Sequence, residues 1–167
     1  GPLSRAQLAR RVGAQAPSLL RTARLEELGL IQRSALTPTD VLHVTGEFRA
    51  WDAEAAAHAL DVFSQLYGAT PEDMARRVRE LVVRRLAGEI VQRELPDING
   101  SDPSAWPSLL TRAFETSGSE ALQVSLSYSR PVIAIGAPVG PFFPEVGERL
   151  GAEVVIPPHA EVANAIG

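Results

Sequence analysis

Apolar side chains recur every three or four positions over residues 53–67, as they do on the buried face of a helix. They are Ala56, Leu60, Phe63 and Tyr67. Asp52 precedes this stretch and belongs to the residue types that accept hydrogen bonds from the first amides of a helix. Gly68 follows it and suits a helix end. We therefore predict a helix over 53–67, capped by Asp52.

A longer helical pattern begins at Thr70 and Pro71, which are typical of a helix start, and runs to Leu95, before Pro96. Its apolar face consists of Met74, Val78, Leu81, Val82, Leu86 and Ile90. The other face carries most of the arginines between residues 76 and 85. This second face is expected to be solvated, with ion pairs one turn apart, Glu72 with Arg76 and Glu80 with Arg84.

The pattern becomes strand-like in the last third of the chain. Leu122, Val124, Leu126 and Tyr128 alternate with other residues, which predicts a half-buried strand, and the apolar residues 132–135 predict a fully buried one. The remaining predictions are a helix over 108–116, a helix over 142–150, a strand over 154–156 and a final helix from Ala160. Strand and helix alternate at a spacing that predicts an α/β fold with a parallel sheet.

Residues 4–33 predict two short helices around a turn at Gly13, with Gly29 ending the second helix and a short strand over 30–33. This order is that of a winged helix. Further on, Pro38 disfavours helix, while Thr39 or Asp40 suits the cap of a short one. Thr37 and Thr39 are expected to be cap and turn residues.

The charge is unevenly distributed. Residues 1–35 carry six Arg and two Glu, a net charge of +4, whereas the whole chain has a net charge of -4. We therefore divide the chain into a helical, winged-helix-like segment over 1–35 and an α/β lobe over 36–167. DNA phosphates would be met by Arg5, Arg10, Arg11, Arg21 and Arg24. The acidic remainder opposes such binding, so a nucleic-acid partner is not expected.

The composition excludes several chemistries. All 16 basic residues are Arg, so a Walker phosphate loop and a lysine Schiff base are absent, and without Cys there is no thiolate chemistry. The three histidines are too scattered to predict a metal site. No apolar run reaches the roughly 20 residues of a membrane span, and no signal peptide is visible, so a cytoplasmic protein is expected. The opening Gly1-Pro2 resembles the remnant of a removed tag, and we expect a fragment of a longer protein.

The apolar run over 132–135 ends at a loop without reactive side chains, which consists of Gly136, Ala137, Pro138 and Val139. In open parallel sheets, ligands bind beyond the carboxyl ends of the strands. Glycine also lets the backbone approach a ligand closely. The loop therefore suits flat contact with a nucleotide base or ribose, or it is a plain strand-to-helix turn.

Two segments resemble a known family. They are ALTPTDVLHVTG with the following WDAEAA, and RPVIAIGAPVGPFFPEVGERLGAEVVIPPHAEVANAIG. Together they are similar to the C-terminal part of the hydantoinase A-type catalytic chain of the hydantoinase/oxoprolinase family. The resemblance covers roughly residues 36–167. It implies a partial actin-like ATPase (ribonuclease H-like) lobe, ATP and Mg²⁺ as cofactors, and ATP-dependent opening of cyclic amides such as hydantoins and 5-oxoproline.

The resemblance also implies roles for particular residues. Gly136, Ala137, Pro138 and Val139 would contact adenosine, and the last helix, 161–167, would pack at the hinge between lobes. The superfamily's phosphate-binding hairpin, with Asp-x-Gly-Gly-Thr, does not occur in the sequence. The catalytic residues are therefore unknown, and this chain alone is expected to be inactive. Its expected partners are the rest of the parent chain or a partner subunit, and the parent enzyme's cyclic amide.

Four more residues are candidates for ligand or hinge roles: Asp40, His159, Glu161 and Asn164. Asp40 suits a magnesium or catalytic carboxylate, but a helix cap is its more ordinary role. Glu161 equally suits the positive end of a helix dipole. His43, in an apolar stretch, is expected to be a core histidine with satisfied nitrogens, and His58 a surface residue.

Two other functions stay open. One is a winged-helix DNA-binding regulator fused to a ligand-sensing α/β lobe, which salt-dependent DNA binding would reveal. The other is a purely structural lobe that recruits a partner subunit, which a mixed assembly would favour.

Overall fold

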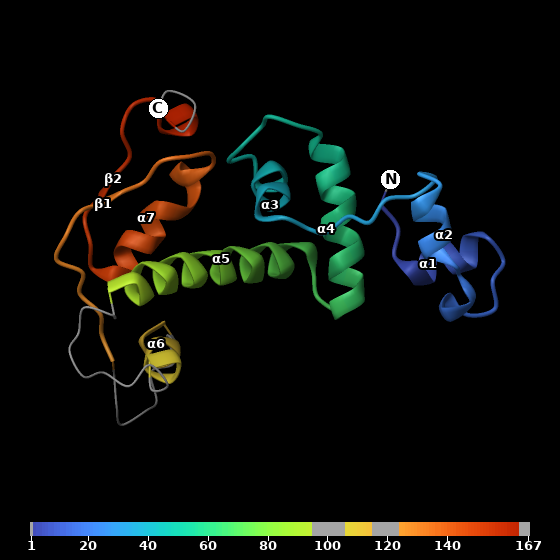
Figure 1. Cartoon of the computed structure of the whole chain (residues 1–167), viewed down its shortest axis with the longest axis horizontal. Helices are drawn as coiled ribbons and strands as arrows, with labels where there is room; N and C mark the ends of the chain where they lie inside the picture. The colour runs from blue at the N-terminus through green and yellow to red at the C-terminus, as the bar shows by residue number, and fades with distance from the viewer. Residues whose placement is uncertain (1, 95–105, 115–123, 164–167) are drawn as a thin grey trace. The chain divides into compact units, whose positions relative to one another are not determined.

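The structure is a computed structural model that describes residues 2–94, 106–114 and 124–163 (Figure 1). The chain divides into two units, Gly1–Val78 and Arg79–Gly167, and the boundary falls inside one long helix. Helices predominate in the described residues. Two short parallel strands in this part give the α/β class that the sequence predicts.

The N-terminal segment is helical, as predicted. Its elements are α1 (Arg5–Arg11), the 3₁₀ helix η1 (Pro17–Leu19) and α2 (Thr22–Glu27). Gly13 and Gly29 have positive φ angles of 72° and 68°, which favour glycine, so both turns lie where the sequence predicts them.

The strand predicted over 30–33 is not formed. The amides of Leu30 and Ile31 instead donate to the Leu25 carbonyl, at 2.9 and 3.4 Å, so the chain folds back onto the end of α2. These bonds take up backbone groups that a strand ladder would need. The segment therefore has two short α-helices but lacks the predicted strand.

Helix α3 (Pro38–Thr45) begins two residues earlier than a cap at Thr39 would allow. Thr37 is the N-cap, and its Oγ1 accepts a hydrogen bond from the Asp40 amide at 3.2 Å. The Asp40 carboxylate accepts in return from the Thr37 amide at 2.7 Å. Pro38 occupies the first helical turn, where a missing amide hydrogen costs nothing. The prediction that Thr39 or Asp40 is the N-cap was therefore wrong, and the expectation that Thr37 is a cap or turn residue is confirmed. Asp40 closes the capping box.

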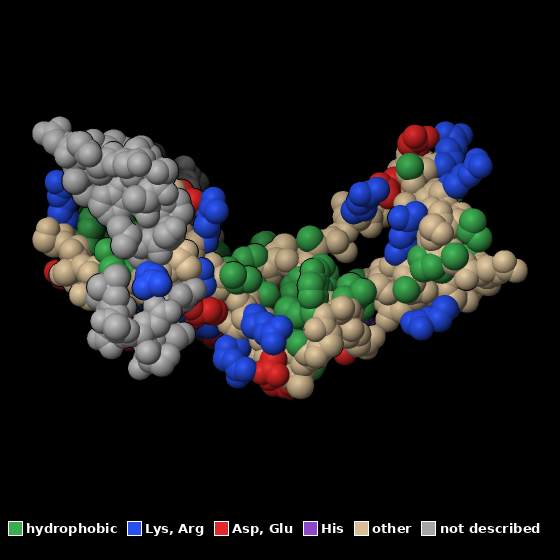
Figure 2. Space-filling view, turned by 90° about the horizontal axis from the view of Figure 1, so that it is seen from below, with side chains coloured by type: hydrophobic (Ala, Val, Ile, Leu, Met, Phe, Trp, Pro, Cys, Tyr) green, Lys and Arg blue, Asp and Glu red, His purple; other side chains and the backbone are tan. Residues whose placement is uncertain are grey.

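Helix α4 (Ala53–Tyr67) has the bounds that the sequence predicts. Asp52 accepts hydrogen bonds from the amides of Glu54 and Ala55, at 2.9 and 3.1 Å, and Gly68 ends the helix with a φ of 61°. Leu60 is buried, but Tyr67 at the last position is 68% exposed. Figure 2 shows hydrophobic side chains gathered near this end of α4.

The core of the first unit lies between α3, α4 and the start of α5 (Pro71–Glu94). Its buried residues are Val41, Leu60, Met74 and Ala75, with Leu36, Ala69 and Val78 packed against them. Burying one such Leu or Val stabilises a fold by about 1.5–3 kcal/mol. This small apolar cluster is therefore what joins the three helices.

The buried face of α5 differs from the prediction. Val83 and Ala87 are fully buried in the second unit, whereas Leu81, predicted to be buried, is 62% exposed. The face is set by α7 (Val139–Leu150), which reaches α5 through two ion pairs, Glu145 with Arg79 and Arg149 with Glu80. A single apolar stripe along the sequence does not reveal this partner.

Arg79 was predicted to lie on a solvated face, and that prediction was wrong. Its side chain is only 26% exposed and donates to Glu145 and to the Pro141 carbonyl, both at 2.5 Å. Its guanidinium also lies 5.7 Å from the centroid of the Phe142 ring. The i,i+4 pairs predicted for Arg76 and Glu80 are replaced by bonds to Asp73 and Arg149.

The second unit contains a parallel strand–helix–strand arrangement, as predicted. Strand β1 (Val132–Ile133) pairs with β2 (Val154–Val155), with Val132 opposite Val154, and α7 connects them. The contact between α7 and β2 is close at Gly147, where a Cβ atom would lie 2.7 Å from Val154 Cγ2. Gly147 thus permits the helix to approach the sheet.

Two details of the predicted sheet were wrong. Residues 124–129 form no strand, although their side chains alternate between half-buried and exposed; Leu122 lies outside the described residues. The run over 132–135 is not fully buried, because Ile133 and Ile135 are 67% and 50% exposed. The last predicted helix begins at Ala160, as predicted, with the 3₁₀ helix η3 (Ala160–Val162). Helix α6 (Trp106–Phe114) confirms the helix predicted over 108–116 and begins two residues earlier; residues 115 and 116 lie outside the described residues.

Candidate functional site

The loop after β1 is built around one unusual backbone conformation. Gly136 has a φ of 108°, which a residue with a side chain rarely adopts. The Ala137–Pro138 peptide bond is cis, and α7 begins directly after it at Val139. Pro138 provides no side-chain cap, so the first amides of α7 lack a side-chain acceptor. A turn between a strand and a helix thus lies at 136–138, where the sequence predicts it.

The same loop is tied to the turn at η3. The Gly136 amide donates to the Ala160 carbonyl at 2.6 Å, so this amide is not available to a ligand while the bond persists. No heavy atom lies within 4 Å of the position that a Cβ of Gly136 would take. Ala137 is exposed beside it. The loop thus offers a slim, open surface rather than hydrogen-bond donors.

Two of the predicted ligand or hinge residues are the sequence neighbours of Ala160. They therefore lie near this loop, because the Ala160 carbonyl accepts the hydrogen bond from Gly136. His159 has a φ of 62° and an exposed side chain, and Glu161 is also exposed. The bond from Gly136 to Ala160 thus brings predicted positions from two segments together. Asn164 lies outside the described residues.

Asp40 belongs to the other unit and is engaged in the capping box of α3. Its Oδ2 accepts from both the amide and the hydroxyl of Thr37, each at 2.7 Å. This is the ordinary role of such a residue. Within the described ranges, no three side chains of His, Asp or Glu lie so that they could hold a metal ion.

His43 is a buried histidine with both ring nitrogens bonded, as predicted. Nδ1 lies 2.7 Å from the Thr39 carbonyl and therefore carries the proton, while Nε2 accepts from the Trp51 amide at 2.9 Å. Its ring stacks on Trp51 and meets the edge of Phe48. These contacts fix the loop between α3 and α4 and leave no ring nitrogen for catalysis. His58 is exposed, as expected.

The N-terminal arginines do not form a recognition surface typical of a winged helix. Figure 2 shows arginines on the N-terminal segment, but Arg5 donates to the Leu20 carbonyl at 3.0 Å and Arg24 pairs with Glu27 at 3.0 Å. Helix α2, in the place of a recognition helix, has six residues, and its last two are acidic. Arg10, Arg11 and Arg21 are exposed.

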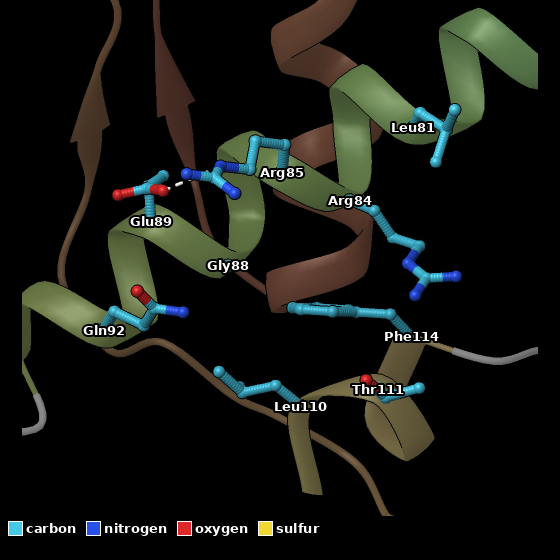
Figure 3. Close-up of a pocket in the computed structure, with 9 residues that line it drawn as sticks. All are labelled: Leu81, Arg84, Arg85, Gly88, Glu89, Gln92, Leu110, Thr111 and Phe114. Carbon is cyan, nitrogen blue, oxygen red and sulfur yellow. Dashed lines mark ion pairs between the residues drawn. The ribbon is translucent and has the colours of Figure 1, made fainter. Parts of the chain in front are cut away.

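A pocket between α5 and α6 was missed by the sequence analysis (Figure 3). Its volume is about 300 Å³, and Arg84 and Gly88 line it from α5. Glycine is rare in the middle of a long helix because it lowers helix stability by about 1 kcal/mol relative to Ala. Gly88 was therefore the signal in the sequence that pointed to this place.

Tyr128 joins the segment before β1 to the end of α5. Its hydroxyl donates to Glu94 Oε1 at 3.0 Å. This hydrogen bond is the main reason that the pKa of the Tyr128 phenol lies above its usual range, while loss of solvent contact and the Glu94 charge act in the same direction. Arg130, which pairs with Glu94 at 3.4 Å, partly opposes the shift.

Comparisons of the chain with protein-family models, curated proteins and solved structures gave no match. Among the helices in the described ranges, none combines the length and the apolar character that crossing a membrane requires.

Proposed function

We propose that residues 36–167 form one lobe of an ATP-dependent hydrolase of the hydantoinase/oxoprolinase type, which opens cyclic amides. In this proposal the fold is part of an actin-like ATPase, and the loop Gly136, Ala137, Pro138 and Val139 contacts adenosine. The observation that carries it is the open, side-chain-free surface at Gly136, directly beyond the carboxyl end of a parallel strand. The resemblance of the closing segment supports the same assignment.

The exposed face of the small sheet supports a lobe that is completed by other residues. Ile133 and Ile135 from β1 and the loop, with Val155 from β2, are 67%, 50% and 40% exposed. A two-stranded sheet is marginal by itself and gains stability when such a face is covered. In this proposal the covering surface belongs to the parent chain or to a partner subunit.

The chemistry of the reaction lies outside this lobe. When bound, ATP supplies the phosphoryl group that makes the ring carbonyl of the amide electrophilic. The Asp-x-Gly-Gly-Thr hairpin that would hold the γ-phosphate and Mg²⁺ is absent from the sequence. The role left to this chain is to hold the flat face of the nucleoside at Gly136 and Ala137, without hydrolysing ATP.

An amide NMR titration of the chain with magnesium-ATP and, separately, with adenosine tests the proposal. We expect saturable shifts at 136–140 with both ligands, because the shared part of the two ligands is the nucleoside. Ala137→Val should weaken both, since it adds bulk to the open surface, whereas Ala50→Val, at an exposed loop position of the other unit, should not. Unmoved loop signals at millimolar concentrations of both ligands would contradict adenosine contact by this chain.

A further inference from the structure

The pocket between α5 and α6 combines polar and apolar walls. Helix α5 contributes Leu81, Arg84, Arg85, Gly88, Glu89 and Gln92, and α6 contributes Leu110, Thr111 and Phe114. Leu110 and Phe114 are 6% exposed and so form a packed apolar floor. Figure 3 shows Phe114 and Leu110 facing α5 across the pocket, with Gln92 at one end and Arg84 at the other. A volume of about 300 Å³ is at the lower end of small-molecule sites.

The space at Gly88 is not required by the packing of the chain. A Cβ atom added to Gly88 would have no heavy atom within 4 Å, and its backbone is helical without a positive φ. The chain thus accepts the cost of glycine in a helix without a neighbour that demands it. This differs from Gly147, where Val154 Cγ2 would lie 2.7 Å from the added atom.

The charges of the pocket leave one cation without a partner. Arg85 is paired with Glu89 at 2.8 Å, so these two charges offset each other. No hydrogen bond or ion pair joins the half-buried Arg84 to another described residue. In Figure 3 Arg84 extends toward Phe114, away from the Arg85–Glu89 pair. One uncompensated guanidinium favours a monoanion over a dianion such as phosphate.

We infer that this pocket binds a small monocarboxylate with a flat apolar body. Arg84 pairs with the carboxylate. The Thr111 hydroxyl and, at the opposite end, the Gln92 amide are further polar groups that line the pocket. The apolar body lies over Leu110 and Phe114, in the space that Gly88 leaves open. This site is separate from the Gly136 loop and does not depend on the proposed ATPase function.

Benzoate is the probe that tests this inference, in an amide NMR titration of the full chain. We expect saturable shifts at Arg84, Gly88 and Thr111, with a dissociation constant on the order of 1 mM for a ligand of this size in an open site. Benzamide has the same shape without the charge and should bind at least about tenfold more weakly. Acetate, which lacks the ring, should also bind more weakly.

Three variants separate binding from structure. Arg84→Gln should weaken benzoate binding about tenfold or more, because it removes the charged partner. Arg77→Gln removes an exposed arginine elsewhere on α5 and should leave binding unchanged. Gly88→Ala should raise the thermal midpoint of the chain and yet weaken binding, which a merely structural role of Gly88 would not produce.

Several results would overturn the inference. They are a failure to saturate at about 10 mM benzoate, tenfold above the expected constant, equal binding of benzamide, and equal weakening by Arg77→Gln. Stronger binding of inorganic phosphate than of benzoate would make this a phosphate site instead. None of these results bears on the nucleoside titration, which follows signals at 136–140.

Discussion

The α3–α4 core and the β1–α7–β2 arrangement are held together by different interactions. In the first, Leu42 and Leu60 are almost fully buried, and the two buried polar residues, His43 and Ser64, both have hydrogen-bond partners. The second unit also buries apolar side chains, with Val83, Val146 and Leu150 fully buried, but there arginines add links from α7 to α5 and α6. Arg79 and Arg149 each bond a carboxylate and a backbone carbonyl. The first core is therefore mainly apolar, whereas the second combines apolar burial with partly exposed ion pairs.

The difference matters because the two kinds of interaction contribute unequally. Burying a large aliphatic side chain stabilises a fold by about 1.5–3 kcal/mol, whereas an exposed ion pair contributes about 0–1 kcal/mol. The second unit also leaves Ile133 and Ile135 exposed on one sheet face. We therefore expect the loss of a buried aliphatic side chain to lower the free energy of unfolding more than the loss of one of these ion pairs.

The largest expected effect is that of Leu60→Ala. Leu60 is 1% exposed in the first core, so the truncation should lower the free energy of unfolding of that unit by about 2–5 kcal/mol. Urea unfolding followed by NMR signals from each unit would measure it. Leu66→Ala on the same helix is the control, because Leu66 is 58% exposed and should change the unfolding free energy by less than about 0.5 kcal/mol. An equal decrease of the unfolding free energy in both units would show that they unfold together, and would contradict the treatment of the two cores as separate.

A smaller effect is expected for Gly147→Ala in the second unit. The added Cβ would lie 2.7 Å from Val154 Cγ2 and 3.0 Å from the Ala152 carbonyl oxygen. Helix α7 must then move away from β2, at a cost of about 1–3 kcal/mol in unfolding free energy. Gly140→Ala in the same helix has no atom within 4 Å of its Cβ and should be neutral or stabilising in the same urea assay. If both variants behave alike, the close contact between α7 and β2 does not exist in solution.

Arg79→Met should cost about 1–2 kcal/mol, because it keeps the apolar stem but removes the bonds to Glu145 and Pro141. The readout is the urea midpoint of signals from α7. Arg77→Met, at an exposed position on the same helix, is the matched control and should leave that midpoint unchanged. An unchanged midpoint for Arg79→Met would mean that burial, not ion pairing, joins α5 to α7.

The smallest effect concerns Tyr128 and pH. Because the Glu94 hydrogen bond raises the pKa of the folded Tyr128 phenol above its unfolded value of about 10, it stabilises the fold below that pH. This contribution is lost as the pH rises through the raised pKa. Glu94→Gln should lower the pKa of Tyr128, measured from its ring signals, and Glu89→Gln should not, since Glu89 pairs with Arg85 instead.

Local features of the fold were predictable from the sequence, and features set by distant partners were not. Asp52 and Gly68 act within one turn of the helix that they bound, so their residue types were sufficient. The sequence could not tell which of Leu81 and Val83 is buried. The buried face of α5 depends on α7, which lies more than fifty residues away in the sequence. The strands are shorter than predicted: in the described residues, the pairing of β1 with β2 covers only Val132–Ile133 and Val154–Val155.

The candidate site also has features that the sequence predicts and features that it does not. The turn at Gly136 could be predicted, because a strand, a glycine and a helix follow one another in the sequence. Its bond to Ala160 could not, since the two residues meet only after the chain has folded. The pocket at Arg84 also depends on where α6 packs, and only Gly88 hinted at it.

The bond from the Gly136 amide to the Ala160 carbonyl has a consequence for hydrogen exchange. A protected amide exchanges with solvent only when its bond opens, so the exchange rate of Gly136 reports how often the η3 turn detaches from the loop. A ligand that requires this amide would compete with the turn, and its binding would release Ala160–Val162. A ligand that only covers the open face of Gly136 would slow the exchange instead. One amide can thus distinguish two modes of recognition without any substitution.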